Sequence, residues 1–362
     1  MSDTSTIQII DMYLEEASAP MFLSGFFQSP PRNFHTTEDV EMDIQRDDEQ
    51  VAIVIQDLTL PPNKNENTLY TNKRFKPPIY DEEGAVTAFD MIQRLAGQNP
   101  FSNPDYAANA VRQAFEVYRK LENKIRRAVE LMASQVLQTG QLTLINAAGT
   151  GVYALDFSPK ATHFTNAAAT WATTGATGDP LADLAALATV VRRDGKHNPN
   201  KLIFGESAFQ RFLANAKVQL ALESRRAVLA EVMPQARGQG ATFQGWVWIG
   251  HYRFEMWTYD GFYKHPQTGV ATPFVVTTNV IMMSEGGRLD LTFGAIPTIL
   301  PPDPRLSAFL PSRISSEGRG LDLSTNAYVT PDNKRVMVSA GTRPLTIPTA
   351  IDTFATISAI QA

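Results

Sequence analysis

Histidine is the side chain best suited to proton transfer and metal binding near neutral pH, and this chain has five of them. They are His35, His163, His197, His251 and His265. They lie far apart, and none forms the HxH or HExxH spacing that brings two imidazoles to one metal ion. Each is therefore predicted to be a surface or turn residue rather than a ligand or a catalytic base.

Motifs for nucleophilic attack and phosphate binding are incomplete. Gly205-Glu206-Ser207 begins like a nucleophile elbow, but the closing glycine that lets strand and helix approach is missing. Gly238-Gln239-Gly240 and Gly318-Arg319-Gly320 lack the strand and helix context of a dinucleotide site. Asp81-Glu82-Glu83 lies in a polar segment, where no burial would shift the protonation of its carboxylates. We expect no catalytic residue, no metal and no cofactor, and hence no enzyme.

Composition bounds the class of protein. The 362 residues are 43% hydrophobic and 19% charged, which is typical of a folded chain long enough for two or more cores. The net charge of −5 argues against a protein whose main task is to grip nucleic acid. Cysteine is absent, which excludes disulfides and thiolate chemistry. Neither a signal peptide nor an apolar run of about 18 residues is present, so we expect the chain to stay in the cytosol.

The element around which the chain is organised is a long helix predicted at 104–139. Apolar residues recur along it at steps of three and four, which places them on one stripe. The stripe is Ala107, Val111, Ala114, Tyr118, Leu121, Ile125, Ala128, Met132 and Val136, and the opposite face carries Arg112, Glu116, Arg119, Glu122, Arg126, Arg127 and Glu130. At 1.5 Å per residue the helix is roughly 50 Å long. A coiled coil or a bundle would need a second helix of similar length, so a spine across a sheet is favoured.

The rest of the pattern predicts an α+β fold. Asp179-Pro180 is an N-cap and first-position pair that opens a helix. At 245–259 the tryptophans share one face and Val247 and Ile249 the other, which predicts a strand buried on both sides. Strands are predicted at 34–45, 141–145, 152–157, 201–204, 245–259, 274–283, 335–339 and 345–354, and helices at 85–96, 181–193 and 207–215.

Two segments have no obvious place in a core. Residues 21–27, MFLSGFF, are apolar and bounded by prolines, and are either a core fragment or a segment that docks on a neighbouring molecule. Residues 61–78 are polar and basic, so paired strands there would project from the body as an arm. Such an arm could contact nucleic acid or an acidic patch on another subunit. The net negative charge of the chain favours the subunit.

Three motifs resemble a known family. The FL-x-x-FF pattern of residues 21–27, followed by 34–40, FHTTEDV, looks like its N-terminal signature. Residues 204–226, ending in Arg225-Arg226, match a second motif, and 259–263 followed by Phe274 and 280–283 match a third. In this order and spacing, with the long helix, they resemble the major capsid proteins of tailed bacteriophages, lambda-type branch.

The resemblance implies a Hong Kong 97-type fold. Its parts would be an N-terminal arm and first strand (1–46), an extended β-hairpin loop (47–80), a peripheral domain with the spine helix (81–178), an axial domain (179–331) and C-terminal strands of the peripheral domain (332–362). Such proteins form hexamers and pentamers that close an icosahedral shell around packaged DNA, assembled in the host cytoplasm. The polar tract 306–333 is long for the lambda pattern and is given no role by the resemblance.

The resemblance also implies subunit contacts and partners. The residues predicted to contact other subunits are Phe22, Leu23, Phe26, Phe27, Lys64, Tyr70, Lys73, Arg74, Phe75, Lys76, Arg225 and Arg226. A scaffold and a portal are expected during assembly, and a cement protein is a possible partner on the outer surface. Lys64 and Lys73 lie in the loop that forms Lys–Asn crosslinks in another branch, but the lambda-type branch does not crosslink. The rivals are an encapsulin-like compartment protein, an enzyme on another α+β fold and a tail-tube protein.

Overall fold

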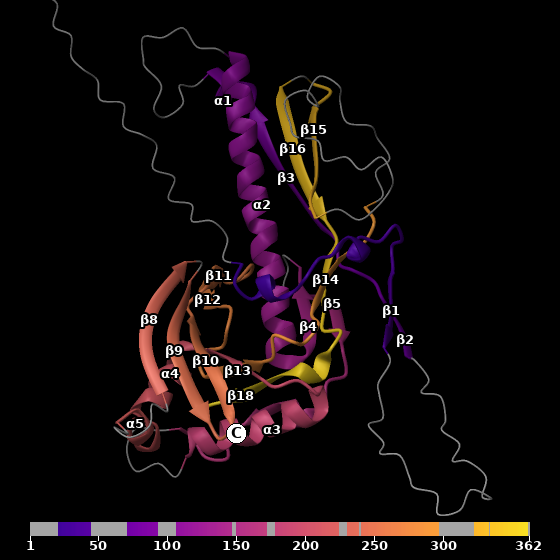
Figure 1. Ribbon diagram of the computed structural model, residues 1–362. Helices are drawn as coiled ribbons and strands as arrows, with labels where there is room; N and C mark the ends of the chain where they lie inside the picture. Colours follow the sequence, from indigo (N-terminus) through magenta and orange to yellow (C-terminus); the bar gives the residue numbers. More distant parts are fainter. Residues whose placement is uncertain are drawn as a thin grey trace, which may run out of the picture.

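The computed structural model describes residues 21–44, 71–92, 106–146, 150–171, 178–223, 230–238, 240–296, 322–332 and 334–360. Figure 1 shows one long helix, α2, running through the molecule, with a small sheet beside its upper part and a larger sheet beside its lower end. The predicted helix start at Pro104 and most of the predicted loop at 47–80 lie outside the described residues.

The spine helix α2 (Tyr106–Thr139) ends where predicted, because Gly140 follows with a φ of +66°. The predicted apolar stripe is confirmed from Ala114 onward, with Leu121, Ile125, Met132 and Val136 buried. Glu130, predicted on the solvent face, is instead fully buried. The last three turns bury Val129, Ala133 and Leu137 as well, so most of the circumference of this end of the helix is covered, and the stripe of Leu131, Gln135 and Thr139 is left partly or fully exposed.

A three-stranded antiparallel sheet lies along the first half of α2. Its order is β15 (Ser324–Val329), β16 (Arg335–Thr342) and β3 (Tyr80–Thr87). Val338 and Ala327 pack under Ala114, and Ala340 packs under Ile125. The prediction of a lone long helix across a sheet is therefore confirmed for the described residues.

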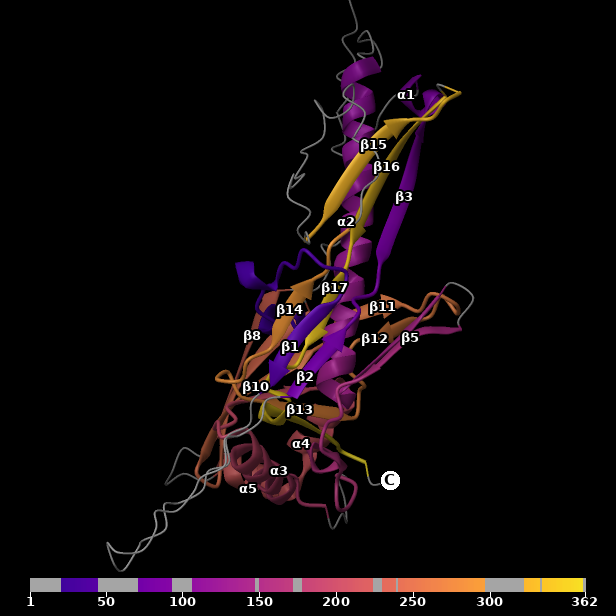
Figure 2. The same ribbon diagram turned by 90° about the vertical axis from the view of Figure 1, so that its right-hand side faces the viewer.

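The larger sheet has seven strands. Its order is β6 (Phe164–Asn166), β18 (Phe354–Ser358), β13 (Asn279–Met283), β7 (Lys201–Phe204), β10 (Tyr252–Tyr259), β9 (Ala241–Ile249) and β8 (Ala230–Gly238). One face packs against α3 (Pro180–Gly195), α4 (Glu206–Ala214) and α5 (Ala216–Glu223), which gather at one end of the molecule in Figure 2. The other face packs against the C-terminal end of α2 and the N-terminal arm.

Alternation along the strands divides the two cores. In β7, Leu202 and Phe204 face the three helices, while Ile203 faces the spine. In β13, Met282 and Ile281 divide in the same way. Successive side chains of a strand point to opposite faces, so central strands that are apolar throughout can serve both cores.

Smaller elements complete the fold. Two-stranded ladders join β1 (Val40–Ile44) with β2 (Thr71–Phe75), β4 (Gln141–Ile145) with β5 (Gly151–Asp156), β11 (Phe262–Lys264) with β12 (Ala271–Pro273), and β14 (Asp290–Phe293) with β17 (Pro344–Ile347). Short 3-10 turns occupy Ser24–Phe26, Pro31–Asn33, Ala161–His163 and Ile351–Thr353. The predicted strands at 141–145, 152–157 and 201–204 and the helix opened by Asp179 are confirmed.

Several predicted boundaries are wrong, in part because pairing with a distant strand outweighs local propensity. The helix predicted at 85–96 begins as α1 (Ala88–Ile92) only after β3 has run through Thr87. Thr87 and Asp90 then cap the helix, with the Thr87 N–H 2.8 Å from the Asp90 carboxylate. The strands predicted from Phe34 and from Phe274 begin at Val40 and Asn279.

The tryptophan segment differs most from its prediction. It forms two strands, β9 and β10, joined at Gly250, whose φ of +64° suits the turn. The face with Val247 and Ile249 is buried, but Trp248 on the other face is 42% exposed. The prediction of burial on both sides is therefore wrong at Trp248 in the single chain, whereas Tyr259 on the same face is buried.

The predicted domain limits differ from the sheet topology. The polar tract 306–333 contains β15, which pairs with β16 rather than lying in an axial domain. The C-terminal β18 joins β13 and β6 in the seven-stranded sheet instead of returning to the three-stranded one. The chain passes from one sheet to the other more than once, and both sheets pack against α2. A division into consecutive segments could not show this.

Close approach of β3 to the spine gives a testable prediction. A Cβ on Gly84 would lie 2.5 Å from Cγ1 of Val117, a side chain that is stiff in a helix. Gly84→Val should lower the free energy of unfolding by about 1–3 kcal/mol through overpacking. Gly151→Val in β5, where nothing lies within 4 Å, is the matched control and should leave it nearly unchanged. Denaturant unfolding of unassembled subunits, followed by circular dichroism, measures both; equal stabilities would contradict the packing described.

Candidate assembly interface

A buried carboxylate fixes the start of the N-terminal arm. Glu130 on α2 accepts hydrogen bonds from the backbone N–H of Leu23 at 2.7 Å and of Ser24 at 2.8 Å, and from the Tyr259 hydroxyl at 2.8 Å. Its three hydrogen-bond partners among the described residues are all donors, and the two oxygens of a carboxylate can accept from all of them. Burial, and then the Glu130 charge, raise the pKa of Tyr259, so the phenol keeps its proton and stays a donor. Arm, spine and β10 therefore meet at one group.

Sequence reasoning missed this residue because Glu130 continues the charged positions of the helix. The signal was present, since residues 128–137 include Ala128, Val129, Leu131, Met132 and Ala133 in succession around the helix. A helix that is apolar all round is buried, and a carboxylate within it must find donors.

The apolar segment MFLSGFF belongs to this chain's own core. Leu23 and Phe27 are buried, which corrects the prediction that they dock on another molecule and favours the core fragment that the sequence also allowed. Phe22 packs its ring 5.4 Å from that of Trp257, and Phe26 lies 5.2 Å from Phe22, centroid to centroid. These two side chains are only partly buried, so part of each ring remains available to a neighbour.

The arm continues as an extra chain beside β14. Gln28 forms a bridge to Asp290 and Phe34 to Phe293, both parallel, and the two phenylalanine rings stack at 5.0 Å. Asn33 donates to the carboxylate of buried Asp290 and to the Gln28 carbonyl, each at 3.1 Å. The arm is thus held by backbone pairing as well as by the Glu130 carboxylate.

The root of the predicted extended loop is the β1–β2 ladder. Val40 pairs with Phe75, and the register continues to Ile44 opposite Thr71. Phe75 is buried beside Phe157 and therefore anchors the ladder rather than offering a contact. Figure 1 shows this ladder at the side of the molecule away from the seven-stranded sheet.

Two of the predicted contact cations, Arg74 and Lys76, already have partners within the chain. Arg74 pairs with Glu41 across the ladder, and Lys76 pairs with Glu38 at 2.7 Å. The Lys76 ammonium, followed by Arg343, holds the pKa of Glu38 below its usual value. All four side chains of these pairs are more than half exposed, so the acidic partners expected on another subunit are, in the single chain, its own.

A buried guanidinium, also missed from the sequence, closes the base of this region. Arg343 donates to the carbonyls of Ala295 at 2.9 Å and Pro77 at 3.3 Å, and lies 3.5 Å from Glu38. It is almost completely buried between β16 and β17. One side chain thus joins the arm, the end of the loop and the residues after β14.

The remaining predicted contacts are placed less fully. Lys64, Tyr70, Arg225 and Arg226 lie outside the described residues, and Lys73 is described only by its backbone pairing with Met42. These residues stay predictions.

The arrangement of spine, sheets and anchored arm can be compared with known proteins. A sequence model described as phage major capsid protein E matches residues 13–359. The chain belongs to this family. The match confirms the resemblance. The chain is a shell-forming capsid protein, and its family is one of structural proteins.

Solved structures show the same fold at low sequence identity. A protein assigned as the capsid protein of a prophage in Escherichia coli CFT073 has a TM-score of 0.58 and 16% identity, covering 81% of this chain and 80% of that one. A phage-related protein from Bordetella bronchiseptica RB50 has a TM-score of 0.51 and 11% identity, covering 95% and 93%. A chain from Gordonia phage Cozz has a TM-score of 0.50 and 9% identity, covering 97% and 89%. No curated protein sequence matches the chain. The fold of this capsid protein is of the Hong Kong 97 type.

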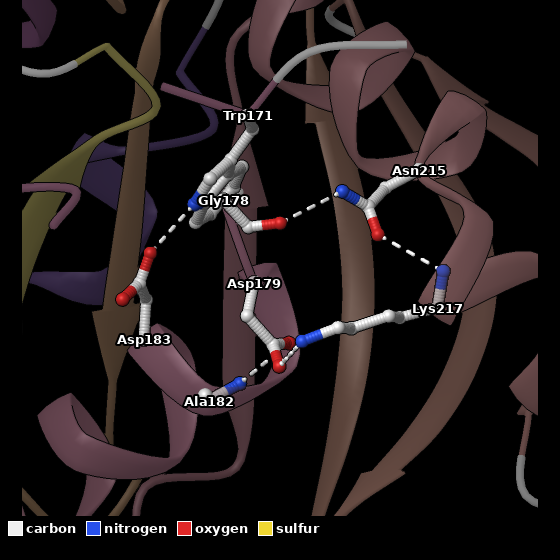
Figure 3. A network of polar contacts seen from close by, with 7 residues as sticks. All are labelled: Trp171, Gly178, Asp179, Ala182, Asp183, Asn215 and Lys217. Atoms are coloured by element: carbon white, nitrogen blue, oxygen red, sulfur yellow. Dashed lines mark hydrogen bonds and ion pairs between the residues drawn. The ribbon is translucent and has the colours of Figure 1, made fainter. Parts of the chain in front are cut away.

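A second polar network holds α3, α4 and α5 of the capsid protein together (Figure 3). Asp179 caps α3 by accepting from the Ala182 N–H at 3.2 Å and pairs with the Lys217 ammonium of α5. Burial opposes its ionisation, but these two partners outweigh burial and lower the pKa of Asp179. Trp171 donates to Asp183 at 2.8 Å, and Asn215 donates to the Gly178 carbonyl at 3.2 Å.

The capsid protein's histidines do not gather. His163 was predicted at the surface or in a turn; it lies in a turn but is buried, with Nδ1 2.9 Å from the Phe354 carbonyl and Nε2 3.3 Å from Asp194. Within the described stretches, no three His, Asp or Glu side chains are grouped to hold a metal ion. No helix in the described part of the chain has the length and apolarity to cross a membrane.

The Glu130 carboxylate gives the second prediction. Glu130→Gln replaces one accepting oxygen with an NH2 group that faces donors, so the free energy of unfolding should fall by about 1.5–3 kcal/mol. Limited proteolysis should also cut at residues 21–27 faster. Glu116→Gln, on the same helix in a 3.7 Å surface pair with Arg112, is the control and should change little. Equal stabilities and equal cleavage rates in the two variants would contradict the role of Glu130.

Proposed function

We propose that this capsid protein assembles as hexamers and pentamers into the icosahedral head shell of a tailed double-stranded DNA phage. The observation that supports this most is the position of the buried polar groups. Glu130, Asp290 and Arg343 fix the roots of the arm and of the predicted loop on the subunit. Segments with rigid roots can reach neighbours in a defined direction.

The contacts beyond these roots are of a different kind. Arg74 and Lys76 make exposed ion pairs, which contribute little and can exchange their acidic partner for one on a neighbouring copy. Weak contacts of this kind become effective when a closed shell repeats them many times, because each copy is held at several places at once. Lys64, Tyr70, Lys73, Arg225 and Arg226 are proposed to add to them.

The charge of the subunit suits a container for DNA. With a net charge of −5, its wall confines the polyanion without binding it tightly. Assembly in the host cytoplasm, with a scaffold and a portal and with a cement protein as a possible outer partner, is part of the proposal.

Deleting residues 63–70 tests the role of the loop. The deletion leaves β1 and β2 whole, so the subunit should stay soluble and folded, with an unchanged unfolding transition, but should fail to form particles. Replacing the same eight residues by a Gly/Ser linker of equal length controls for chain closure and should fail as well. Electron microscopy of the concentrated proteins reads the result. Closed particles from either variant would show that the loop is dispensable.

An encapsulin-like compartment is the alternative, and its shell shares the fold. The family match favours the phage capsid. Nuclease-protected double-stranded DNA in particles purified from infected cells is the expected result. Particles that enclose protein and no DNA would favour the alternative.

A further inference from the structure

A row of aromatic side chains crosses one face of the seven-stranded sheet. The described residues of the chain cover only part of this row. On this face Tyr259 is buried, and Trp257 is partly covered by Phe22 of the arm and by Phe243, 5.2 Å away. Farther along the same two strands, Trp246 and Trp248 on β9 lie opposite Glu255 and Arg253 on β10. We call these four residues the tryptophan strip.

The tryptophan strip is built for contact. The Arg253 guanidinium lies 4.9 Å above the Trp246 ring, which orders both side chains. Arg253 and Glu255 have no ion-pair partner among the described residues. Tryptophan and arginine are the residue types that contribute most where protein surfaces meet. The strand pair has the sequence of a doubly buried one, but at Trp248 and Arg253 the described residues cover one face only, so these positions call for a second cover.

The opposite face of the same domain offers a complementary surface. Helix α5 buries Val218 against the sheet but presents Leu220 outward, 68% exposed. Glu206, on the adjoining helix α4, is exposed and has no ion-pair partner within the described residues. We call Leu220 and Glu206 the α5 surface, which offers an apolar side chain and an acidic one to the tryptophan and the arginine of the tryptophan strip.

The symmetry of a ring of identical copies indicates which surface packs against the tryptophan strip. This step rests on the proposed assembly into rings of identical copies. Copies related by rotation about an axis all face the same way, so one face of each meets the opposite face of the next. We propose that the tryptophan strip of one subunit packs against the α5 surface of the neighbouring copy, with Trp248 beside Leu220 and Arg253 beside Glu206.

Paired cysteines test the contact directly, since the chain has none of its own. Trp248→Cys and Leu220→Cys in one chain, treated with a short bis-maleimide after assembly, should give a ladder of covalent oligomers. Each single variant should stay monomeric, because the contact is head to tail. Arg253→Cys with Glu206→Cys is a second pair that leaves both apolar residues in place.

Three outcomes would overturn the proposal. They are intact particles in which both pairs stay monomeric, dimers from Trp248→Cys alone, which mean that strip meets strip, or an unassembled subunit that gives the same ladder. Failure of the proposed function is seen separately, as the absence of wild-type particles in electron micrographs.

Substitution gives an independent readout. Trp248→Ser should raise the protein concentration needed for assembly by about tenfold or more. Tyr328→Ser, at a tyrosine 38% exposed on the three-stranded sheet, is the matched control and should leave that concentration within about twofold. Equal assembly thresholds for the two variants would also overturn the proposal.

Discussion

The buried carboxylate of Glu130 constrains more of this capsid protein than any other group described. It lies where the spine helix is surrounded by apolar side chains, so removing any of its three donors would leave a charge that water cannot reach. Leu23 and Ser24 must therefore present their N–H groups to it, and Tyr259 its hydroxyl. The path of the arm and the position of β10 beside the spine follow from that requirement.

Elsewhere in the molecule, too, buried polar groups fix the extended segments to the subunit, and exposed ion pairs lie beyond them. Asp290 and Arg343 hold the later arm and the base of the predicted loop with buried hydrogen bonds, whereas the side chains of Arg74 and Lys76 beyond them make exposed ion pairs. Buried polar groups specify one geometry because every alternative leaves them unsatisfied. Exposed pairs are exchanged at little cost. A subunit that must first fold by itself and then join neighbours needs both kinds of contact, in that order along its extended segments.

Periodicity predicted the elements that are governed by local rules. The apolar stripe predicted the length and the end of α2, and Asp179-Pro180 predicted the start of α3. The three motifs, in their order and spacing and with the long helix, predicted the family. What failed depended on long-range pairing: β3 extends to Thr87 because β16 lies beside it, and β18 joins β13 across the chain. Glu130 looked like a surface charge, and nothing was predicted for Arg343, because their donors and acceptors are distant in sequence. The exposed tryptophan face was predicted to be buried because the apolar pattern of 245–259 indicates that both faces need to be covered. The pattern does not indicate whether the same chain or another molecule covers them.

Amide hydrogen exchange at Leu23 and Ser24 in the unassembled subunit tests the central claim most directly. If Glu130 holds the arm before any neighbour is present, both N–H groups should exchange slowly, about as slowly as amides in the buried turns of α2. Glu130→Gln should return both to fast exchange while β7 stays protected. Fast exchange in the wild-type subunit, with protection appearing only in particles, would contradict the account.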